Sequence, residues 1–189
     1  MSDTPLWLDA FPRDYEVAHE RTLRGLSKVP ERVYYPGARR DGGRDGAWLR
    51  IRAATGREWT GVFASELSAG RLSLIASWPH PSTLFVAVGD GPYLVRADDP
   101  DDWSRLDRPT VRRFEAVPEL RLALLLDDDG LSAYDADGLA WESEHLGPDA
   151  QWLGRLDDEV HVRAESPDGT VLHRIALRHG GTTTEPGSW

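Results

Sequence analysis

The sequence predicts an all-β fold: about four blade-like, four-stranded antiparallel repeats, forming a small propeller-like or open β-meander, with one N-terminal helix. The main evidence is a repeat, because Asp90-Gly91, Asp129-Gly130 and Asp168-Gly169 follow one another at intervals of 39 residues. Each dipeptide lies between two apolar runs rich in β-forming residues. Periods of about 20 to 50 residues are typical of repeat architectures, and about 40 residues suit one propeller blade.

The N-terminal segment differs from the rest of the chain. Residues 13–28 contain no proline and one glycine, and Pro12 suits the first turn of a helix. The pattern of apolar side chains fits one helical face, which carries Tyr15, Ala18, Thr22, Leu23 and Leu26. We therefore expect a helical appendage over residues 1–31.

The β-repeat domain is expected over residues 32–180, and hairpins define it. An Asp-Gly pair between alternating hydrophobic residues is a strong hairpin signal, because a type I′ turn needs positive φ at both central residues. With Asp90-Gly91 as the loop, Val88 lies opposite Tyr93 and Val86 opposite Val95. Both faces of this hairpin are mostly apolar, so we expect both to be covered.

Two further hairpins follow the same plan. Leu122–Leu126 leads into Asp129-Gly130, and Val160–Ala164 leads into Asp168-Gly169. The last hairpin has one polar face, as expected of the terminal unit of a stack: His161, Arg163, Glu165 and Arg174. A first, more degenerate unit begins at Asp45-Gly46. The strands expected to close the units are Leu72–Trp78, Val111–Val117 and Trp152–Leu156.

Three of the repeats also carry a tryptophan shortly after a turn. The pieces Ala54-Thr55-Gly56-Arg57-Glu58-Trp59 and residues 133–141, which end at Trp141, resemble the Ala-x-Asp-x-x-Thr-Gly-(x)-Trp repeats of quinoprotein-like (PQQ-type) β-propellers. The resemblance covers about residues 47–177 and implies that Trp59, Trp103 and Trp141 are buried docking residues between neighbouring blades. It maps no residue that binds the quinone cofactor, so we expect no cofactor. Residues 181–189, including Trp189, are expected to form a flexible tail.

Composition narrows the function classes. The net charge is −10 and cysteine is absent, so a disulfide framework and a thiolate metal site are excluded. Nucleic-acid binding is not expected, because it needs a basic face. The sequence contains no apolar stretch of membrane-spanning length and no basic region typical of a secretory signal near Met1, so we expect a cytoplasmic, acidic protein of bacterial type without a membrane association.

Several clusters of polar side chains are candidates for chemical sites. Asp127-Asp128-Asp129, with Asp135 and Asp137, offers carboxylates for calcium, but position twelve of the loop is Gly138 rather than glutamate, and a solvated hairpin tip is the preferred interpretation. His161 and His173 flank one hairpin on opposite predicted faces, which disfavours a shared zinc ion. The other candidates are His80 between two prolines, Glu142 with Glu144, and the glycine-rich loop 41–46. None matches a catalytic, cofactor or metal motif, so we name no site residue.

The function that the sequence favours is a non-enzymatic protein-interaction module, a monomer or small homo-oligomer with a protein partner. Repeat stacks offer broad rigid surfaces to partners. Two alternatives stay open. One is a hydrolase of a small polar substrate, with its site at loop ends among Asp127, Asp129, His145 and His161. The other is a calcium-stabilised binding domain.

Overall fold

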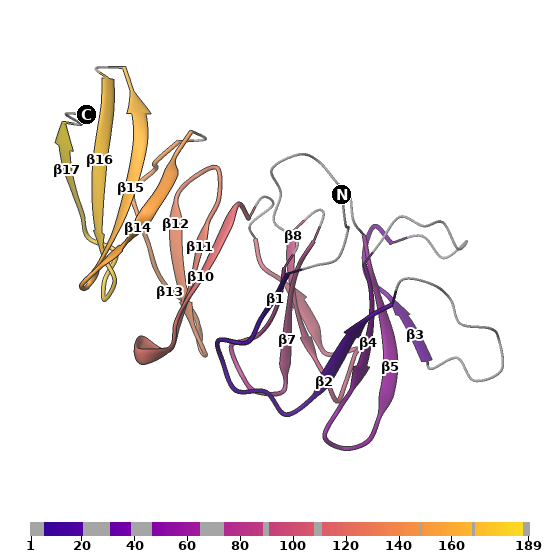
Figure 1. Cartoon of the computed structure of the whole chain (residues 1–189). Helices are drawn as coiled ribbons and strands as arrows, with labels where there is room; N and C mark the ends of the chain where they lie inside the picture. Colours follow the sequence, from indigo (N-terminus) through magenta and orange to yellow (C-terminus); the bar gives the residue numbers. More distant parts are fainter. Residues whose placement is uncertain are drawn as a thin grey trace. The chain divides into compact units, whose positions relative to one another are not determined.

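The computed structural model describes residues 6–20, 31–38, 47–64, 74–88, 91–107, 111–147, 149–167 and 169–186. This part of the chain is all β, with seventeen strands, one short 3-10 helix and four separate sheets (Figure 1). The chain divides into two compact units, unit 1 (residues 1–109) and unit 2 (residues 110–189), and each holds two sheets. The expected all-β class and the four sheets are confirmed. Neither unit closes into a propeller.

Unit 1 contains a five-stranded and a four-stranded sheet. The first has the order β1 (Leu6–Leu8), β6 (Leu74–Ser77), β7 (Thr83–Val88), β8 (Gly91–Arg96) and β9 (Trp103–Arg105). The second has the order β2 (Glu16–His19), β4 (Ala47–Arg52), β5 (Glu58–Phe63) and β3 (Glu31–Tyr34). Neighbouring strands are antiparallel, except that β1 runs parallel to β6 and β3 parallel to β5.

The predicted N-terminal helix is wrong within the described residues. Residues 16–19 form β2, in which Val17 lies opposite Ile51 of β4 and packs against the core of unit 1. Burial in β2 alternates with a period of two, so pairing with β4 overrides the helical pattern. The N-terminal segment therefore supplies strands to both sheets of unit 1, as the dark trace from β1 to β2 shows in Figure 1. The rest of the predicted helix, residues 21–28, lies outside the described part.

A tryptophan joins the two sheets of unit 1. Trp59 of β5 is fully buried, and its indole Nε1–H donates a hydrogen bond to the carbonyl oxygen of Ala97, at the end of β8, over 2.8 Å. Tyr35 stacks on Phe63 with ring centroids 4.4 Å apart, beside Tyr93 of β8. The core of unit 1 thus lies between its two sheets.

Unit 2 repeats this arrangement with two antiparallel meanders. One has the order β10 (Arg113–Val117), β11 (Leu122–Leu126), β12 (Leu131–Asp135) and β13 (Gly138–Glu142), with the 3-10 turn η1 (Pro118–Leu120) between β10 and β11. The other has the order β14 (Gln151–Leu156), β15 (Glu159–Ser166), β16 (Gly169–Ala176) and β17 (Thr182–Pro186). The indole Nε1–H of Trp141 donates to the carbonyl oxygen of Leu177 over 2.7 Å.

The hairpin prediction is right in its faces and wrong by two residues in its register. Val86 lies opposite Tyr93, and Val88 opposite Gly91, so Gly91 is paired within β8 and is not a loop residue. A shift of two residues keeps every side chain on its predicted face, because strand side chains alternate with a period of two. The buried Phe85 and Ala87 confirm that the second face of this hairpin is covered.

The predictions for the three tryptophans have different outcomes. Trp59 and Trp141 are buried docking residues as expected, whereas Trp103 is 39% exposed and the expectation for it is wrong. Trp103 lies in the short edge strand β9, with its ring beside those of Tyr35 and Tyr93. Residues 182–186 of the expected tail pair with β16 as β17, and Trp189 lies outside the described residues.

Candidate functional site: an acidic unit with exposed leucines

The aspartates considered for calcium hold a turn. Asp127 is only 2% exposed, and its Oδ1 accepts the backbone N–H groups of Asp129 (2.8 Å) and Gly130 (2.9 Å). Arg112 donates through Nη2 to the backbone carbonyl oxygen of Asp127 over 2.7 Å, and its Nε lies 3.2 Å from Oδ1 of Asp128. Among the described residues, no three His, Asp or Glu side chains are grouped so as to hold a metal ion.

Asp127→Ala should lower the stability of unit 2 by about 1 to 2 kcal/mol, because two backbone N–H groups of the turn lose their acceptor. Hydrogen exchange of the amides of β11 and β12 in the whole chain measures this loss. Asp128→Ala, which removes a half-exposed carboxylate beside Arg112, should cost less than about 1 kcal/mol. A rise in melting temperature on adding calcium to the wild type would contradict this structural role.

The two histidines of the last hairpin lie on opposite faces, as predicted. His173 pairs with Val162, a core residue, and so lies on the core face of the sheet. His161 pairs with Arg174 on the other face and lies 3.6 Å from a Glu159 carboxylate oxygen. Desolvation lowers the pKa of His173 below its ordinary value of 6.5, and the negative charge of Glu144 acts in the opposite direction. A shared zinc ion does not fit this geometry.

The lowered pKa of His173 makes unit 2 sensitive to acid. The unfolded chain takes up a proton at this imidazole near pH 6.5, while the folded chain takes it up only at lower pH. The contribution of the neutral His173 imidazole to the free energy of unfolding of unit 2 is therefore complete above pH 6.5. This contribution declines as the pH falls below that value. We expect His173→Gln to flatten the stability profile below pH 6.5, measured by denaturant unfolding at several pH values. His161→Gln is the control and should leave this component unchanged.

The structure contains a histidine–serine side-chain contact that the sequence analysis did not predict. Nδ1 of His80 lies 2.9 Å from Oγ of Ser82, which is 8% exposed, and the N–H of Thr83 donates to the carbonyl oxygen of His80 over 2.8 Å. The distance suits a nucleophile and its base, but both side chains belong to one tight turn between β6 and β7. The only sequence signal was their spacing of two residues around Pro81.

The remaining candidates do not converge. The N–H of Leu146 donates to the carbonyl oxygen of Asp129 over 2.9 Å, which places the neighbouring His145 near the aspartate turn. His161 lies in the other sheet of unit 2. Glu142 ends β13 and Glu144 follows it, both exposed, and loop 41–46 lies outside the described residues.

The charge of the protein is concentrated in unit 2. Residues 110–189 contain seven arginines and sixteen carboxylate side chains, a net charge of −9 out of −10 for the chain. Residues 1–109 contain fifteen basic and sixteen acidic side chains and are nearly neutral. An acidic field of this size attracts cationic partners and repels anionic ones.

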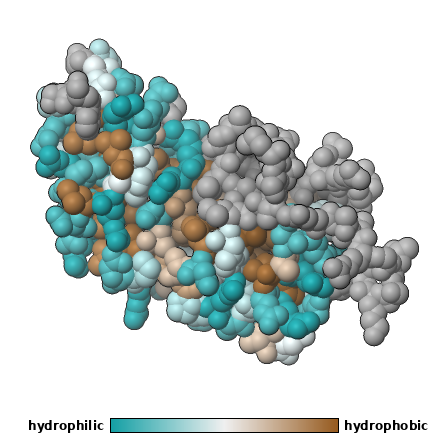
Figure 2. Space-filling model, in the orientation of Figure 1, coloured by the Kyte–Doolittle hydropathy of each residue, from teal (hydrophilic) through white to brown (hydrophobic). Residues whose placement is uncertain are grey.

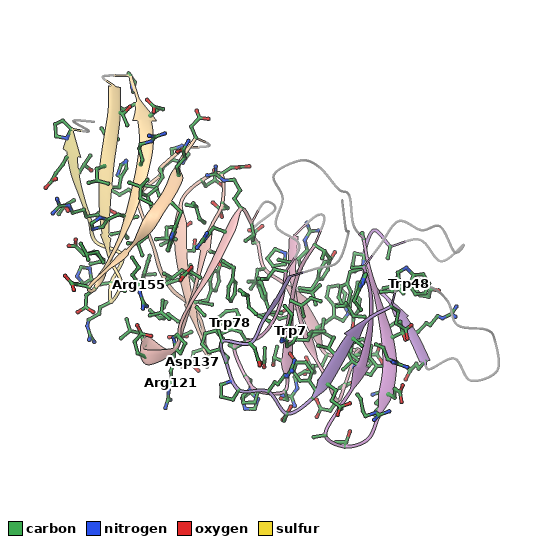
Figure 3. The ribbon with its side chains drawn as sticks, viewed as in Figure 1. Trp7, Trp48, Trp78, Arg121, Asp137 and Arg155 are labelled. Carbon is green, nitrogen blue, oxygen red and sulfur yellow. The ribbon has the colours of Figure 1, made fainter. Side chains whose placement is uncertain are left out.

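Exposed leucines lie on two edge strands of the same unit. Leu139 of β13 is 52% exposed, and Leu153 and Leu156 of β14 are 46% and 61% exposed. Figure 2 shows hydrophobic patches among the hydrophilic atoms that cover unit 2. Arg155, which lies between Leu153 and Leu156 in the sequence of β14, forms an ion pair of 2.7 Å with Glu119 of η1. Figure 3 labels Arg155 on this strand and Arg121, which directly follows η1.

No protein-family model matches the chain, and no curated protein matches it. Within the described residues, no helix has the length and hydropathy needed to cross a membrane.

Proposed function

We propose that the chain is a cytoplasmic, non-enzymatic protein-interaction module built on β-repeats. The observation that carries this proposal is the surface of unit 2, where exposed leucines on sheet edges lie in a strongly acidic unit. Unpaired strand edges and exposed apolar side chains are typical places for another chain to bind. The charge adds selectivity and speeds the encounter with a basic partner.

The packing of the sheets supports a rigid scaffold for such a surface. In both units a buried indole N–H bonds to a carbonyl oxygen of the neighbouring sheet, through Trp59 and Trp141. These contacts also support the resemblance to quinoprotein-like blades at the level of blade packing. Stacked β units of this kind present broad surfaces that change little on binding.

Affinity purification of the tagged chain from a nuclease-treated lysate, with mass spectrometry, tests the proposal. We expect a stoichiometric protein partner whose retention falls as the salt concentration rises, because the field of unit 2 contributes to binding. The control is a chain in which the exposed Asp149, Asp157 and Asp158 are changed to asparagine. Recovery of no stoichiometric partner, together with turnover of a small polar substrate, would favour the hydrolase alternative.

A further inference from the structure

The edge strand β14 differs from most sheet edges of soluble proteins. Sheet edges are usually protected by charge, proline or an additional covering segment. Strand β17, at the opposite edge of the same sheet, follows this rule with three threonines, a glutamate and Pro186. Strand β14 instead exposes Leu153 and Leu156, and no described strand pairs with its outer side.

A bulge contributes to this exposure. The register between β14 and β15 shifts between Trp152 and Gly154, so Leu153 is an extra residue without a partner in the ladder. Bulges redirect side chains at sheet edges. Trp152 still packs against the core of unit 2, while Leu153 is exposed to solvent.

Unit 1 contains a sheet edge that corresponds to β14, and in unit 1 another strand pairs with this edge. Strands β6 to β9 and β14 to β17 are both antiparallel meanders, and in both the third strand leads to the carbonyl that accepts the tryptophan N–H. Four residues before the acceptor carbonyl lie Tyr93 in unit 1 and His173 in unit 2. Tyr93 pairs with Val86, which pairs with Ile75, and His173 pairs with Val162, which pairs with Trp152. Ile75 of β6 therefore corresponds to Trp152 of β14.

In unit 1 this edge is covered by the protein itself. Strand β1 pairs with β6 in parallel, with Leu6 opposite Leu74 and Trp7 opposite Ile75. The three residues of β1 therefore show what this type of edge accepts, namely a short extended apolar segment. The matching stretch of β14 begins at Gln151 and includes the exposed Leu153.

Charge determines which kind of segment suits β14. Exposed carboxylates lie on both sides of the strand, with Asp149 before it and Asp157 and Asp158 after it. The charge of Arg155 within the strand is paired with Glu119, and Arg178 lies 3.9 Å from Asp158 at the solvent-exposed surface. A second copy of the chain would bring another unit of net charge −9 to this edge, so self-pairing is disfavoured. A segment with lysine or arginine at its ends would instead gain charge complementarity.

We propose that β14 is a docking strand for an extended, basic segment of a partner protein, which pairs with it in parallel as β1 pairs with β6. Apolar side chains of the segment cover Leu153 and Leu156, and its basic ends lie near Asp149, Asp157 and Asp158. This inference rests on the proposed interaction function and specifies the surface and the chemistry of the partner.

Selection of random peptides of about twelve residues on the whole chain tests the docking strand. We expect enrichment of alternating apolar residues flanked by lysine or arginine, and increased amide protection over residues 151–156 when a selected peptide binds. The variant Leu153→Ser/Leu156→Ser should weaken that peptide about tenfold or more. The matched control is Leu139→Ser, which removes an exposed leucine from β13 and should leave affinity unchanged.

Three results would overturn the docking strand: no enriched peptide, enrichment of acidic peptides, or equal loss in the Leu139→Ser control. Affinity purification with the Leu153→Ser/Leu156→Ser variant separates this inference from the function on which it rests. If this variant retains a lysate partner, the interaction function is supported and β14 is excluded as the binding site. Loss of the partner from this variant, with retention by Leu139→Ser, supports both.

Discussion

Trp59→Ala should lower the free energy of unfolding of unit 1 by about 3 to 5 kcal/mol, the range for removing a large buried aromatic side chain. Trp59 is fully buried between the two sheets of unit 1, and its neighbours are strands with fixed pairing that can collapse only partly into the space. The substitution also removes the indole donor of the 2.8 Å hydrogen bond to the carbonyl oxygen of Ala97.

Trp59→Phe separates the hydrogen bond from the packing. Phenylalanine retains part of the buried area and loses the N–H donor, so we expect a smaller loss of about 1 to 2 kcal/mol. Hydrogen exchange of the amides of β5, β7 and β8 in the whole chain reports the stability of unit 1. Trp103→Ala is the control, because Trp103 is 39% exposed and should cost less than Trp59. Equal losses at both positions would contradict the docking role of Trp59.

Much of the fold was predictable because its signals are local. Turn residues and alternating hydrophobicity predicted the strands around Val86, Leu124 and Val162. The resemblance to quinoprotein-like repeats implied the burial of Trp59 and Trp141, but it also implied the burial of Trp103, which is 39% exposed. The N-terminal strands were not predictable in this way. Val17 forms a strand because β4 provides a partner far along the sequence, and short segments with apolar residues near helical spacing do not reveal such a partner.

The candidate site was less predictable than the fold. The sequence predicted the strand at Trp152–Leu156, but alternation cannot distinguish an edge strand from one with a neighbour on each side. The exposure of Leu153 depends on a bulge, and the comparison with β6 depends on the parallel pairing of β1. The acidic net charge follows directly from the sequence. Its assignment to one unit required the boundary between the two units, which lies after Pro109.

Gly180→Ala should lower the stability of unit 2 by about 2 to 4 kcal/mol, through backbone strain and overpacking together. Gly180 lies in the turn between β16 and β17 with φ of +69°, in the left-handed region that favours glycine. A Cβ atom at this position would lie 2.7 Å from Cε3 of Trp141. That ring is held by its own hydrogen bond to Leu177, so it cannot move away without losing the contact between the two sheets.

Gly147→Ala is the matched control for Gly180→Ala. Gly147 has φ of +85°, but nothing lies within 4 Å of a Cβ atom built there, so its substitution carries the backbone cost alone, about 1 kcal/mol. The difference between the two variants, measured by hydrogen exchange of β15 and β16, is the cost of crowding Trp141. Combining Gly180→Ala with Trp141→Leu should remove that difference, because the smaller side chain leaves room for the added methyl group. An undiminished cost in the double variant would mean that the close approach of Gly180 to the indole ring does not constrain the packing of unit 2.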